Sequence, residues 1–311
     1  MAEHEELRRS NAESAESVVK AISEQNDHLK GIAKRLDSLI AVQRDARTNT
    51  VHQLERQTKN LENIRLNSSA ATLRDIWSVV GSKQLSLIET LDAITEEGLS
   101  FARFGDGELK MLTRIDFKAR FQRNSPELQA ALRSVLTDPP SNLLIGAPHA
   151  FSDVHWTRAY AEYWDSCRQL FGGIQRFGDS HVSRPVVFES HGALAAERWS
   201  RVWAGKRILI ITGEGSRFDL IPELFSTALG QEFLYSKPRD AFDDLDRLVI
   251  ECKSRCADIV LISLGPAGTI LAALLASEGL QAIDLGHLSN SYLHVFAGGE
   301  LPERTPIERR V

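Results

Sequence analysis

The sequence predicts an α/β fold in which a mainly parallel sheet is covered by helices on both faces and follows a long N-terminal α-helical coiled-coil segment. Up to Ala71 the chain contains no proline and one glycine, which is a helical composition. After that point, short β-type runs alternate with amphipathic helical patterns. Two runs, Ile208–Ile211 and Ile259–Ile262, are apolar throughout, as is typical of parallel strands buried on both faces. We therefore predict a Rossmann-like domain at 76–311 behind a helical segment at 1–75.

Apolar residues of the N-terminal segment recur at alternating three- and four-residue steps, the pattern of a coiled-coil seam. The first series is interrupted only by Gln25 and consists of Ala15, Val18, Ile22, Leu29, Ile32, Leu36 and Leu39. A second series, displaced by one residue, consists of Val51, Leu54 and Leu61. A lone helix has nothing to bury such a stripe against, so we predict a homo-oligomer formed through residues 1–75. A solvated or partly disordered tail that finds its partner helix on another protein is the alternative.

Charge and composition argue against several classes of protein. A formal net charge of −5 disfavours sequence-independent binding of nucleic acid, which needs a basic surface. The three cysteines, Cys167, Cys252 and Cys256, cannot all pair and show no CxxC spacing, so neither a disulfide framework nor a zinc knuckle is expected. There is no 18-residue apolar run and no signal-peptide pattern. We expect a cytoplasmic protein without an integral membrane segment.

The individual elements of the α/β region follow from its periodicity. Strands are expected at 100–103, 142–145, 207–211, 232–235, 258–263 and 281–284. Helices are expected at 126–136, 154–170, 218–229, 242–254 and 267–277. In an open parallel sheet, ligands bind beyond the carboxyl ends of the strands, so functional residues are expected directly after each strand.

Two carboxylates, Asp106 and Glu108, follow the first of these strands and are flanked by Gly105 and Gly107. In an extended loop, side chains two residues apart project to the same side, so the pair suits a hard divalent cation, Mg²⁺ or Mn²⁺. Diphosphate oxygens and water would fill the remaining coordination positions. The alternative is a Gly-Asp-Gly turn that caps a helix starting near Glu108.

A glycine-containing turn follows the very apolar strand at 258–263 and opens a helix, so its backbone N–H groups are candidates to bind a phosphate. It consists of Gly265, Pro266, Ala267, Gly268 and Thr269, and it matches neither GxGxxG nor a P-loop. A plain strand-to-helix turn is the alternative. Further positive charge near a phosphate is expected from Arg184, Lys237 and Arg239.

Asp284 and His287, after the last expected strand, are candidates for acid/base chemistry or for contact with an acceptor hydroxyl. A helix cap with a hydrogen-bonded structural histidine is the alternative for this pair. The chain has no HExxH and no GxSxG sequence, so neither a zinc hydrolase nor a serine hydrolase is indicated.

The order of these motifs resembles the GT-D type of bacterial glycosyltransferase over roughly residues 85 to 296. The resemblance is carried by RFGDGE at 103–108, SRP at 183–185, WAGK at 203–206 before a strand ending near Glu214, Ala241-Phe242, Gly265-Pro266, and DLGH at 284–287. The family's GPTA is replaced here by GPAG at 265–268, and an expected Asn before Ala-Phe is Asp240.

The resemblance implies a metal-dependent glycosyltransferase that moves a hexose, glucose, from a UDP-sugar to a glycan or glycoprotein acceptor. It implies that the metal and diphosphate element is Asp106 with Glu108. Donor binding would involve Arg103, Gly105, Gly107, Arg184, Glu214, Lys237, Gly265, Pro266, Gly268 and Thr269. The alternatives are a non-catalytic coiled-coil scaffold with a nucleotide-binding α/β domain, and a sugar-nucleotide hydrolase or phosphotransferase.

Overall fold

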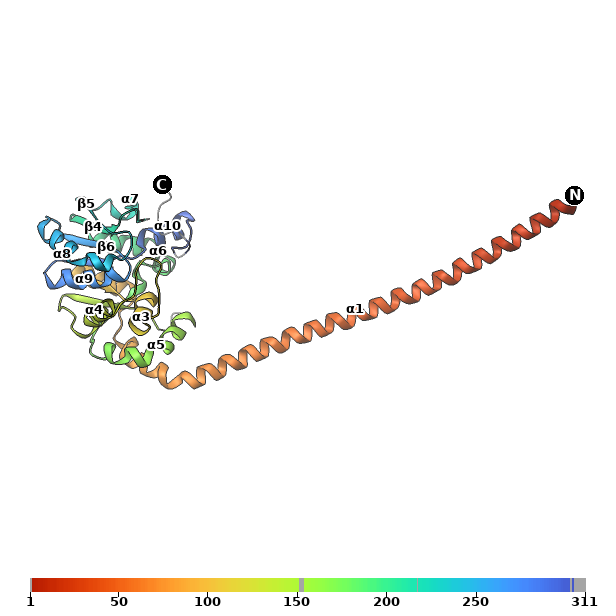
Figure 1. Ribbon diagram of the computed structural model, residues 1–311, viewed down its shortest axis with the longest axis horizontal. Helices are drawn as coiled ribbons and strands as arrows, with labels where there is room; N and C mark the ends of the chain where they lie inside the picture. Colours follow the sequence, from red (N-terminus) through yellow and green to blue (C-terminus); the bar gives the residue numbers. More distant parts are fainter. Residues whose placement is uncertain (1, 151–153, 217, 303, 305–311) are drawn as a thin grey trace. The chain divides into compact units, whose positions relative to one another are not determined.

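The computed structural model describes residues 2–150, 154–216, 218–302 and 304. The chain divides into two compact units, residues 1–69 and residues 70–311. The division falls inside helix α1 (Ala2–Val79), a single 78-residue helix (Figure 1). This confirms the long N-terminal helix that the proline-free composition predicts. Among the described residues, no helix combines the length and the apolar character needed to cross a membrane.

The apolar side chains of the expected coiled-coil seam are exposed along the first unit. Five of them are between 49% and 67% exposed, namely Ile22, Leu29, Ile32, Leu36 and Leu39. The side chains of Ala15 and Val18, which belong to the same series, lie outside the described residues. The helix therefore carries an unburied apolar stripe at the spacing that a coiled coil requires.

The second unit is built on a seven-stranded sheet in the order β3-β2-β1-β7-β6-β4-β5. All of its ladders are parallel. The strands are β1 (Ser100–Arg103), β2 (Leu143–Ala147), β3 (Phe177–Asp179), β4 (Arg207–Gly213), β5 (Gly230–Ser236), β6 (Ile259–Ser263) and β7 (Ala282–Asp284). Six lie within two residues of the expected strands, whereas the three-residue strand β3 was not predicted.

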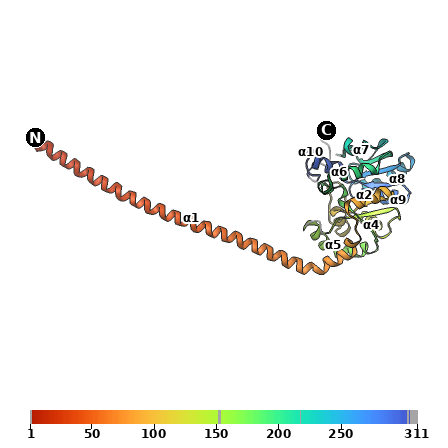
Figure 2. The same cartoon turned by 180° about the vertical axis from the view of Figure 1, so that it is seen from behind.

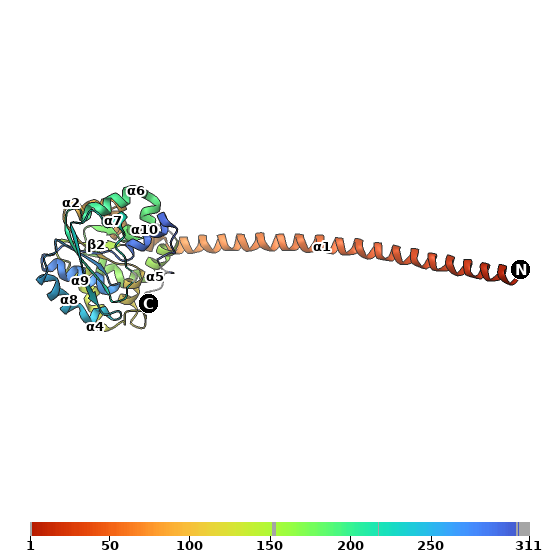
Figure 3. The same cartoon turned by 90° about the horizontal axis from the view of Figure 1, so that it is seen from above.

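Helices cover both faces of this sheet, in agreement with the predicted class. One core cluster lies between the sheet and α2 (Leu87–Glu96), α6 (Pro185–Val202), α7 (Pro222–Phe225) and α10 (Leu288–Ala297). The other lies between the sheet and α3 (Asp106–Thr113), α4 (Pro126–Thr137), α5 (Val154–Gly172), α8 (Leu245–Ser254) and α9 (Pro266–Ser277). Figure 3 shows α2, α6, α7 and α10 on one side of the strands and α4, α8 and α9 on the other. Figure 2 shows the same helices from behind. Along β4, successive residues Ile208 to Ile211 alternate between the two clusters, which explains why the run is wholly apolar.

The helix predicted over 218–229 is wrong. Only the four-residue helix α7 forms there. Pro222 lacks a backbone N–H and forces Ile221 into an extended conformation, with φ −83° and ψ 133°, so no helix can run through this point. The buried apolar residues of the segment do not share one helical face, because Phe218 precedes the helix in irregular backbone and Leu224 lies within α7.

Three short 3₁₀ helices also form within the described residues of this unit, η1 (Gly81–Lys83), η2 (Ser180–Ser183) and η3 (Ala241–Asp244). Two of them follow the carboxyl end of a strand. Helix η2 begins directly after β3, and η3 begins a few residues after β5. Since the sheet is parallel throughout, every strand delivers its following residues to the same rim.

Candidate active site

A pocket of about 110 Å³ opens at this rim, beyond the carboxyl ends of β1, β4, β5, β6 and β7. Five residues predicted from the sequence line it, namely Arg103, Glu214, Lys237, Gly265 and His287. The structure therefore brings together residues that are up to 184 positions apart because each follows a strand of one parallel sheet.

Several lining residues were not singled out by sequence reasoning: Phe121, Phe218, Ser263, Leu264 and Asn290. Phe121 belongs to the connection between α3 and α4, which follows no strand, so no sequence signal marked it. Asn290 lies in the first turn of α10 and could have been found by extending the search past His287 into the helix that starts there.

Asp106 and Glu108 lie in the first turn of α3, so the extended loop expected for them is wrong and the helix-cap alternative describes the backbone. The turn closes because Oε2 of Glu108 accepts a hydrogen bond of 2.8 Å from the N–H of Gly105. Residues two apart on a helix do not face each other. Asp106 turns instead toward Lys110, whose Nζ lies 2.5 Å from Oδ2. Oδ1 of Asp106 is buried and has no hydrogen-bond partner among the described residues.

The two carboxylates remain electrostatically coupled. Burial raises the pKa of Glu108, the Arg103 guanidinium opposes the rise, and the charge of Asp106 adds to it. Burial raises the pKa of Tyr163 on α5 to about 12, again with a contribution from Asp106. Gly107, in the same turn, has open space where a side chain would be. The charge of Asp106 thus acts on both Glu108 and Tyr163, while its Oδ1 has no hydrogen-bond partner among the described residues.

Arg103 ends β1 and extends across the rim. A Cβ on Gly286 would lie 2.1 Å from its Nη2, so the guanidinium packs directly on that glycine, whose φ of 53° also favours glycine. Nη1 donates a hydrogen bond of 3.4 Å to the carbonyl of Ser180. Nε is buried without a partner among the described residues. Arg103 therefore presents positive charge to the pocket and reaches toward the end of β3.

Asp284 lies beneath the pocket and does not line it. It is 2% exposed. Its Oδ1 accepts from the N–H of Gly286 at 3.1 Å, and its Oδ2 lies 3.3 Å from Oγ1 of Thr269. Burial raises the pKa of Asp284 to about 6, with Arg103 lowering it and Glu108 raising it. The carboxyl group is thus engaged by the protein on both oxygens.

The turn at 265–269 serves mainly to pack α9 onto the sheet. The N–H of Gly268 donates to the carbonyl of Gly265 at 2.8 Å, so the free Gly268 N–H expected for phosphate binding is not available. A Cβ on Gly268 would lie 3.1 Å from Ile262. Pro266 is buried, and Thr269 is fully buried with its hydroxyl donating to the carbonyl of Arg103 at 2.9 Å. Of this turn, Gly265 alone lines the pocket.

The far wall of the pocket is formed by two crossing loops. Phe121 lies over Gly265, where a Cβ would come within 2.4 Å of its ring. Asp240, which has φ 53°, accepts from the N–H of Arg123 at 2.7 Å and donates its own N–H to the carbonyl of Phe121 at 2.8 Å. The N–H of Phe242 donates to the side chain of Gln122 at 3.1 Å. The loop after β5 therefore holds Phe121 in place. The carboxylate of Asp240 is occupied by its hydrogen bond from the N–H of Arg123.

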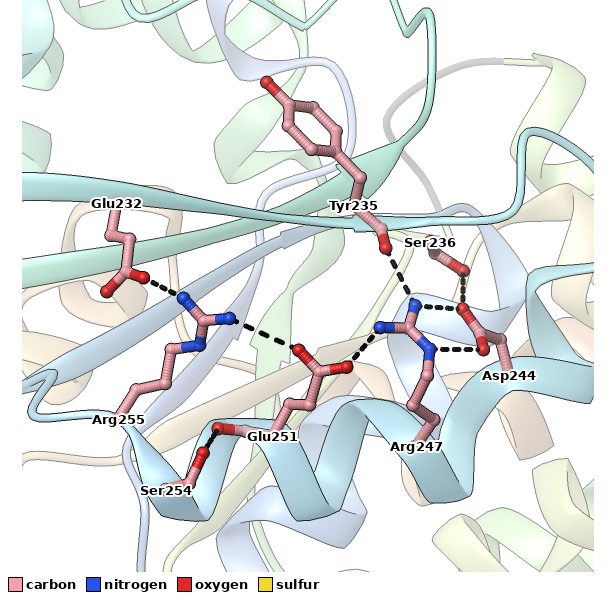
Figure 4. A network of polar contacts seen from close by, with 8 residues as sticks. All are labelled: Glu232, Tyr235, Ser236, Asp244, Arg247, Glu251, Ser254 and Arg255. Atoms are coloured by element: carbon pink, nitrogen blue, oxygen red, sulfur yellow. Dashed lines mark hydrogen bonds and ion pairs between the residues drawn. The ribbon is translucent and has the colours of Figure 1, made fainter.

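A polar network on α8 anchors that loop to the sheet (Figure 4). Arg247 donates to both carboxylate oxygens of Asp244, at 2.8 and 2.6 Å, and to the carbonyl of Tyr235 at 2.8 Å. Ser236, the last residue of β5, donates to Asp244 at 3.0 Å. The hydrogen bonds from Arg247 hold the pKa of Asp244 below its usual range. The position of Lys237, which follows β5 and lines the pocket, is thereby fixed.

Arg184 lies elsewhere. It is the N-cap residue of α6, where its N–H donates to the carbonyl of His181 at 2.9 Å, and it does not line the pocket. Among the described residues, no group of three or more His, Cys, Asp or Glu side chains is arranged to hold a metal ion. A cation at this rim would therefore depend on few carboxylate ligands.

Comparison with known proteins places this chain in a family. A family model described as the glycosyltransferase GT-D fold matches residues 101–301. The chain is 29% identical to a glycosyltransferase GlyD of Streptococcus pneumoniae, over 218 residues that make up 66% of this chain and 26% of that protein. It is 26% identical to a probable glycosyl transferase Gly of Streptococcus gordonii, over 67% of this chain and 32% of that protein. The chain therefore spans only a minor part of these curated relatives.

Solved structures share the fold. A domain of unknown function 1792, described as having a distinct glycosyltransferase fold, superposes with a TM-score of 0.64 at 25% identity, over 74% of this chain and 87% of that one. A new glycosyltransferase from Streptococcus sanguinis superposes with a TM-score of 0.65 at 23% identity, over 74% and 94% of the two chains. Because the family model matches more than half of the sequence and the fold agrees, the chain belongs to the family with the glycosyltransferase GT-D fold.

Proposed function

We propose that this member of the GT-D family is a metal-dependent glycosyltransferase, which transfers a hexose, glucose, from UDP-glucose to a hydroxyl group of a glycan or glycoprotein. The observation that carries the proposal is the buried Oδ1 of Asp106, which has no hydrogen-bond partner in the described part of the chain and follows β1 and the pocket-lining Arg103. A buried carboxylate oxygen without a donor is costly unless a ligand satisfies it, and a divalent cation does so with full charge complementarity. The identity of the donor rests on the family resemblance.

The residues present fit a Mg²⁺ or Mn²⁺ ion bound through few protein ligands. Asp106 would hold it through Oδ1, while Oδ2 stays with Lys110. Glu108, whose Oε2 caps α3, would be the second carboxylate. Such an ion keeps several positions for phosphate oxygens and water. When bound, it would offset the charge that develops on the leaving diphosphate.

The chain's own cations support the same chemistry. Arg103 and Lys237 line the pocket from β1 and β5 and can bind and orient a diphosphate between them. One wall of the pocket is apolar and consists of Phe121, Phe218 and Pro238. This wall suits the uracil ring and excludes water from part of the pocket. A polar end beside an apolar end is the arrangement that a nucleoside diphosphate requires.

Binding of UDP tests the proposal. We expect UDP to raise the melting temperature of the full chain in the presence of Mn²⁺ or Mg²⁺, and to do so much less after treatment with EDTA. A panel of nucleotide sugars, scored by nucleotide release with and without glycan acceptors, then identifies the donor and separates a transferase from a sugar-nucleotide hydrolase. Equal UDP stabilisation with and without the metal would contradict metal dependence.

We also propose that the stripe on α1 assembles the chain into a homo-oligomer. Its apolar residues are exposed at the spacing of a coiled-coil seam. Assembly would present several active sites to one extended or multisite acceptor and so raise the effective concentration of acceptor sites.

Replacing Leu29 and Leu36 by Glu should dissociate this oligomer. Each buried leucine stabilises a coil by roughly 1.5–3 kcal/mol, and a charge in the seam adds a desolvation penalty. Light scattering should report a smaller species for this double variant. The matched control, Ser38→Glu with Ala41→Glu, adds the same charge to exposed positions off the seam and should keep the mass of the wild type. Equal masses for all three proteins would exclude the seam as the assembly element.

A further inference from the structure

A second polar site lies at the end of β3, outside the pocket. Asp179 ends the strand and His181 follows in η2; they are 5% and 8% exposed. Oδ1 of Asp179 accepts from the N–H of His181 at 2.8 Å and lies 3.1 Å from Nδ1 of the same imidazole. The backbone N–H of Asp179 donates to Oγ1 of Thr90 at 2.9 Å, which holds the end of β3 in place. The pair is therefore rigid and buried.

This geometry sets the tautomer of the imidazole. The carboxylate beside Nδ1 favours a proton on that nitrogen, so the lone pair lies on Nε2. Nε2 is buried and has no hydrogen-bond partner among the described residues, although the edge of Trp156 packs against the ring with centroids 5.1 Å apart. Leaving such a buried group without a hydrogen bond is unfavourable, which points to a ligand that satisfies it.

The dyad lies next to the pocket along the sheet. The order β3-β2-β1 places it two strands from Arg103, and Nη1 of Arg103 donates to the carbonyl of Ser180 between the two dyad residues. Two more buried polar atoms in this region have no partner among the described residues, Nε of Arg103 and Oγ of Ser183. Unsatisfied groups from β1 and η2 thus mark a polar subsite on the opposite side of Arg103 from the pocket walls of β4 and β5.

We propose that His181 is the general base for the acceptor hydroxyl and that Asp179 positions it. Nε2 takes the hydroxyl proton as the acceptor oxygen forms a bond to the anomeric carbon of the donor. The bond from that carbon to the diphosphate oxygen breaks, and its electron pair leaves on the nucleoside diphosphate. A single displacement of this kind inverts the anomeric configuration. The assignment rests on the proposed transfer from a nucleotide sugar.

The same geometry disfavours the earlier candidates for this role. Both carboxylate oxygens of Asp284 are engaged below the pocket, by Gly286 and Thr269. His287 lines the pocket, on the side where the nucleotide is proposed to bind. His181 instead combines an orienting carboxylate with a nitrogen that lacks a partner within the described part of the chain.

The test follows UDP release by the full chain with UDP-glucose and Mn²⁺. The acceptors are those active in the panel, or water where none is active. His181→Gln should lower turnover about 10²- to 10⁴-fold, the range of general base catalysis, while the affinity for UDP changes less than about twofold. Asp179→Asn should lower turnover at least about tenfold because it removes the carboxylate that orients the ring. The control is His155→Gln, since His155 is exposed and packs on the same Trp156 at the same 5.1 Å.

Chemical rescue separates a base from a packing residue. Imidazole added to His181→Ala should restore UDP release, and more basic substituted imidazoles should restore more of it, whereas a residue that only packs would show no dependence on basicity. Turnover of His181→Gln within about twofold of the wild type, rescue independent of basicity, or retained anomeric configuration would each overturn the dyad while leaving the proposed transfer intact. No UDP release by the wild type with any donor would instead contradict the proposed function, and the dyad with it.

Discussion

Asp106→Asn is expected to lower glycosyl transfer at least about 100-fold while leaving the fold intact. The change keeps the volume of the side chain but removes the anionic Oδ1 that has no partner among the described residues. Loss of a charged group that positions a metal or stabilises developing charge typically costs several kcal/mol in the transition state. The ion pair with Lys110 is also lost, but it is partly exposed and contributes little to stability.

Glu108→Gln provides the second half of this test. Its amide cannot replace the carboxylate as a metal ligand of equal strength, although its oxygen can still accept from the N–H of Gly105 and keep the start of α3 closed. Turnover and the Mn²⁺-dependent shift in melting temperature with UDP are measured together. Asp116→Asn is the control, because Asp116 is an exposed acid shortly after the same helix, 74% exposed and paired loosely with Arg114. Wild-type turnover in Asp106→Asn or Glu108→Gln would exclude a metal role for that residue.

Asp284→Asn is expected to stabilise the protein at neutral pH. The hydroxyl of Thr269 has one proton and donates it to the carbonyl of Arg103 at 2.9 Å. Oδ2 of Asp284, 3.3 Å from the same hydroxyl, is therefore satisfied best when it carries a proton itself. An asparagine reproduces this state, because its amide can donate to Thr269 while its oxygen accepts from the N–H of Gly286.

The direction of the effect follows from linkage. Burial raises the pKa of Asp284 to about 6 from a usual value of 3.8, so the folded state binds more protons than the unfolded state between these values. Stability contributed by this group is present below pH 3.8 and is lost as the pH rises through 6. At pH 7 to 8 the ionised carboxylate costs about 3 kcal/mol. The asparagine variant avoids that cost.

Thermal unfolding from pH 4 to pH 8 measures this difference. Asp284→Asn should melt roughly 5–10 °C above the wild type at pH 7.5, and the two curves should converge toward pH 4. Asp244→Asn is the contrasting control, since hydrogen bonds from Arg247 lower the pKa of Asp244 and its loss should destabilise at neutral pH. If the melting temperature of the wild type at pH 7.5 equals or exceeds that of the variant, the ionised carboxylate of Asp284 is well hydrogen-bonded in the folded state and the expectation is wrong.

The rim of the sheet could be predicted because strand ends are a local property. Ile208–Ile211 and Ile259–Ile262 are recognisable as buried strands from their apolar runs, and parallel pairing then brings the following residues to one edge. Five of the predicted site residues line the pocket for this reason. The resemblance carried by the ordered motifs added the family, which the comparisons confirm.

The errors in local conformation have separate causes. The two glycines around Asp106 favour a loop, but the Glu108 carboxylate closes a helical turn instead. Strand β3 has three residues and forms because β2 offers it a ladder, with Gly178 packed against Phe101. Helix α6 was not recognised, and Gly192 inside it has a non-helical φ of 53°, which breaks the continuous periodicity that the prediction relies on.

By itself, the sequence determined the α/β class, the long N-terminal helix and the rim on which function is concentrated. The reason is that the hydrophobic period and the ends of strands can be recognised from consecutive residues. The tertiary structure alone decided which polar groups are left unsatisfied. Phe121 reaches the pocket through its contact with the loop after β5. Asp284 acquires its raised pKa through burial, which outweighs the lowering effect of Arg103. The pairing of Asp179 with His181 matters because burial removes water from Nε2. Desolvation depends on everything that packs around a group, and residues distant in the chain supply most of it.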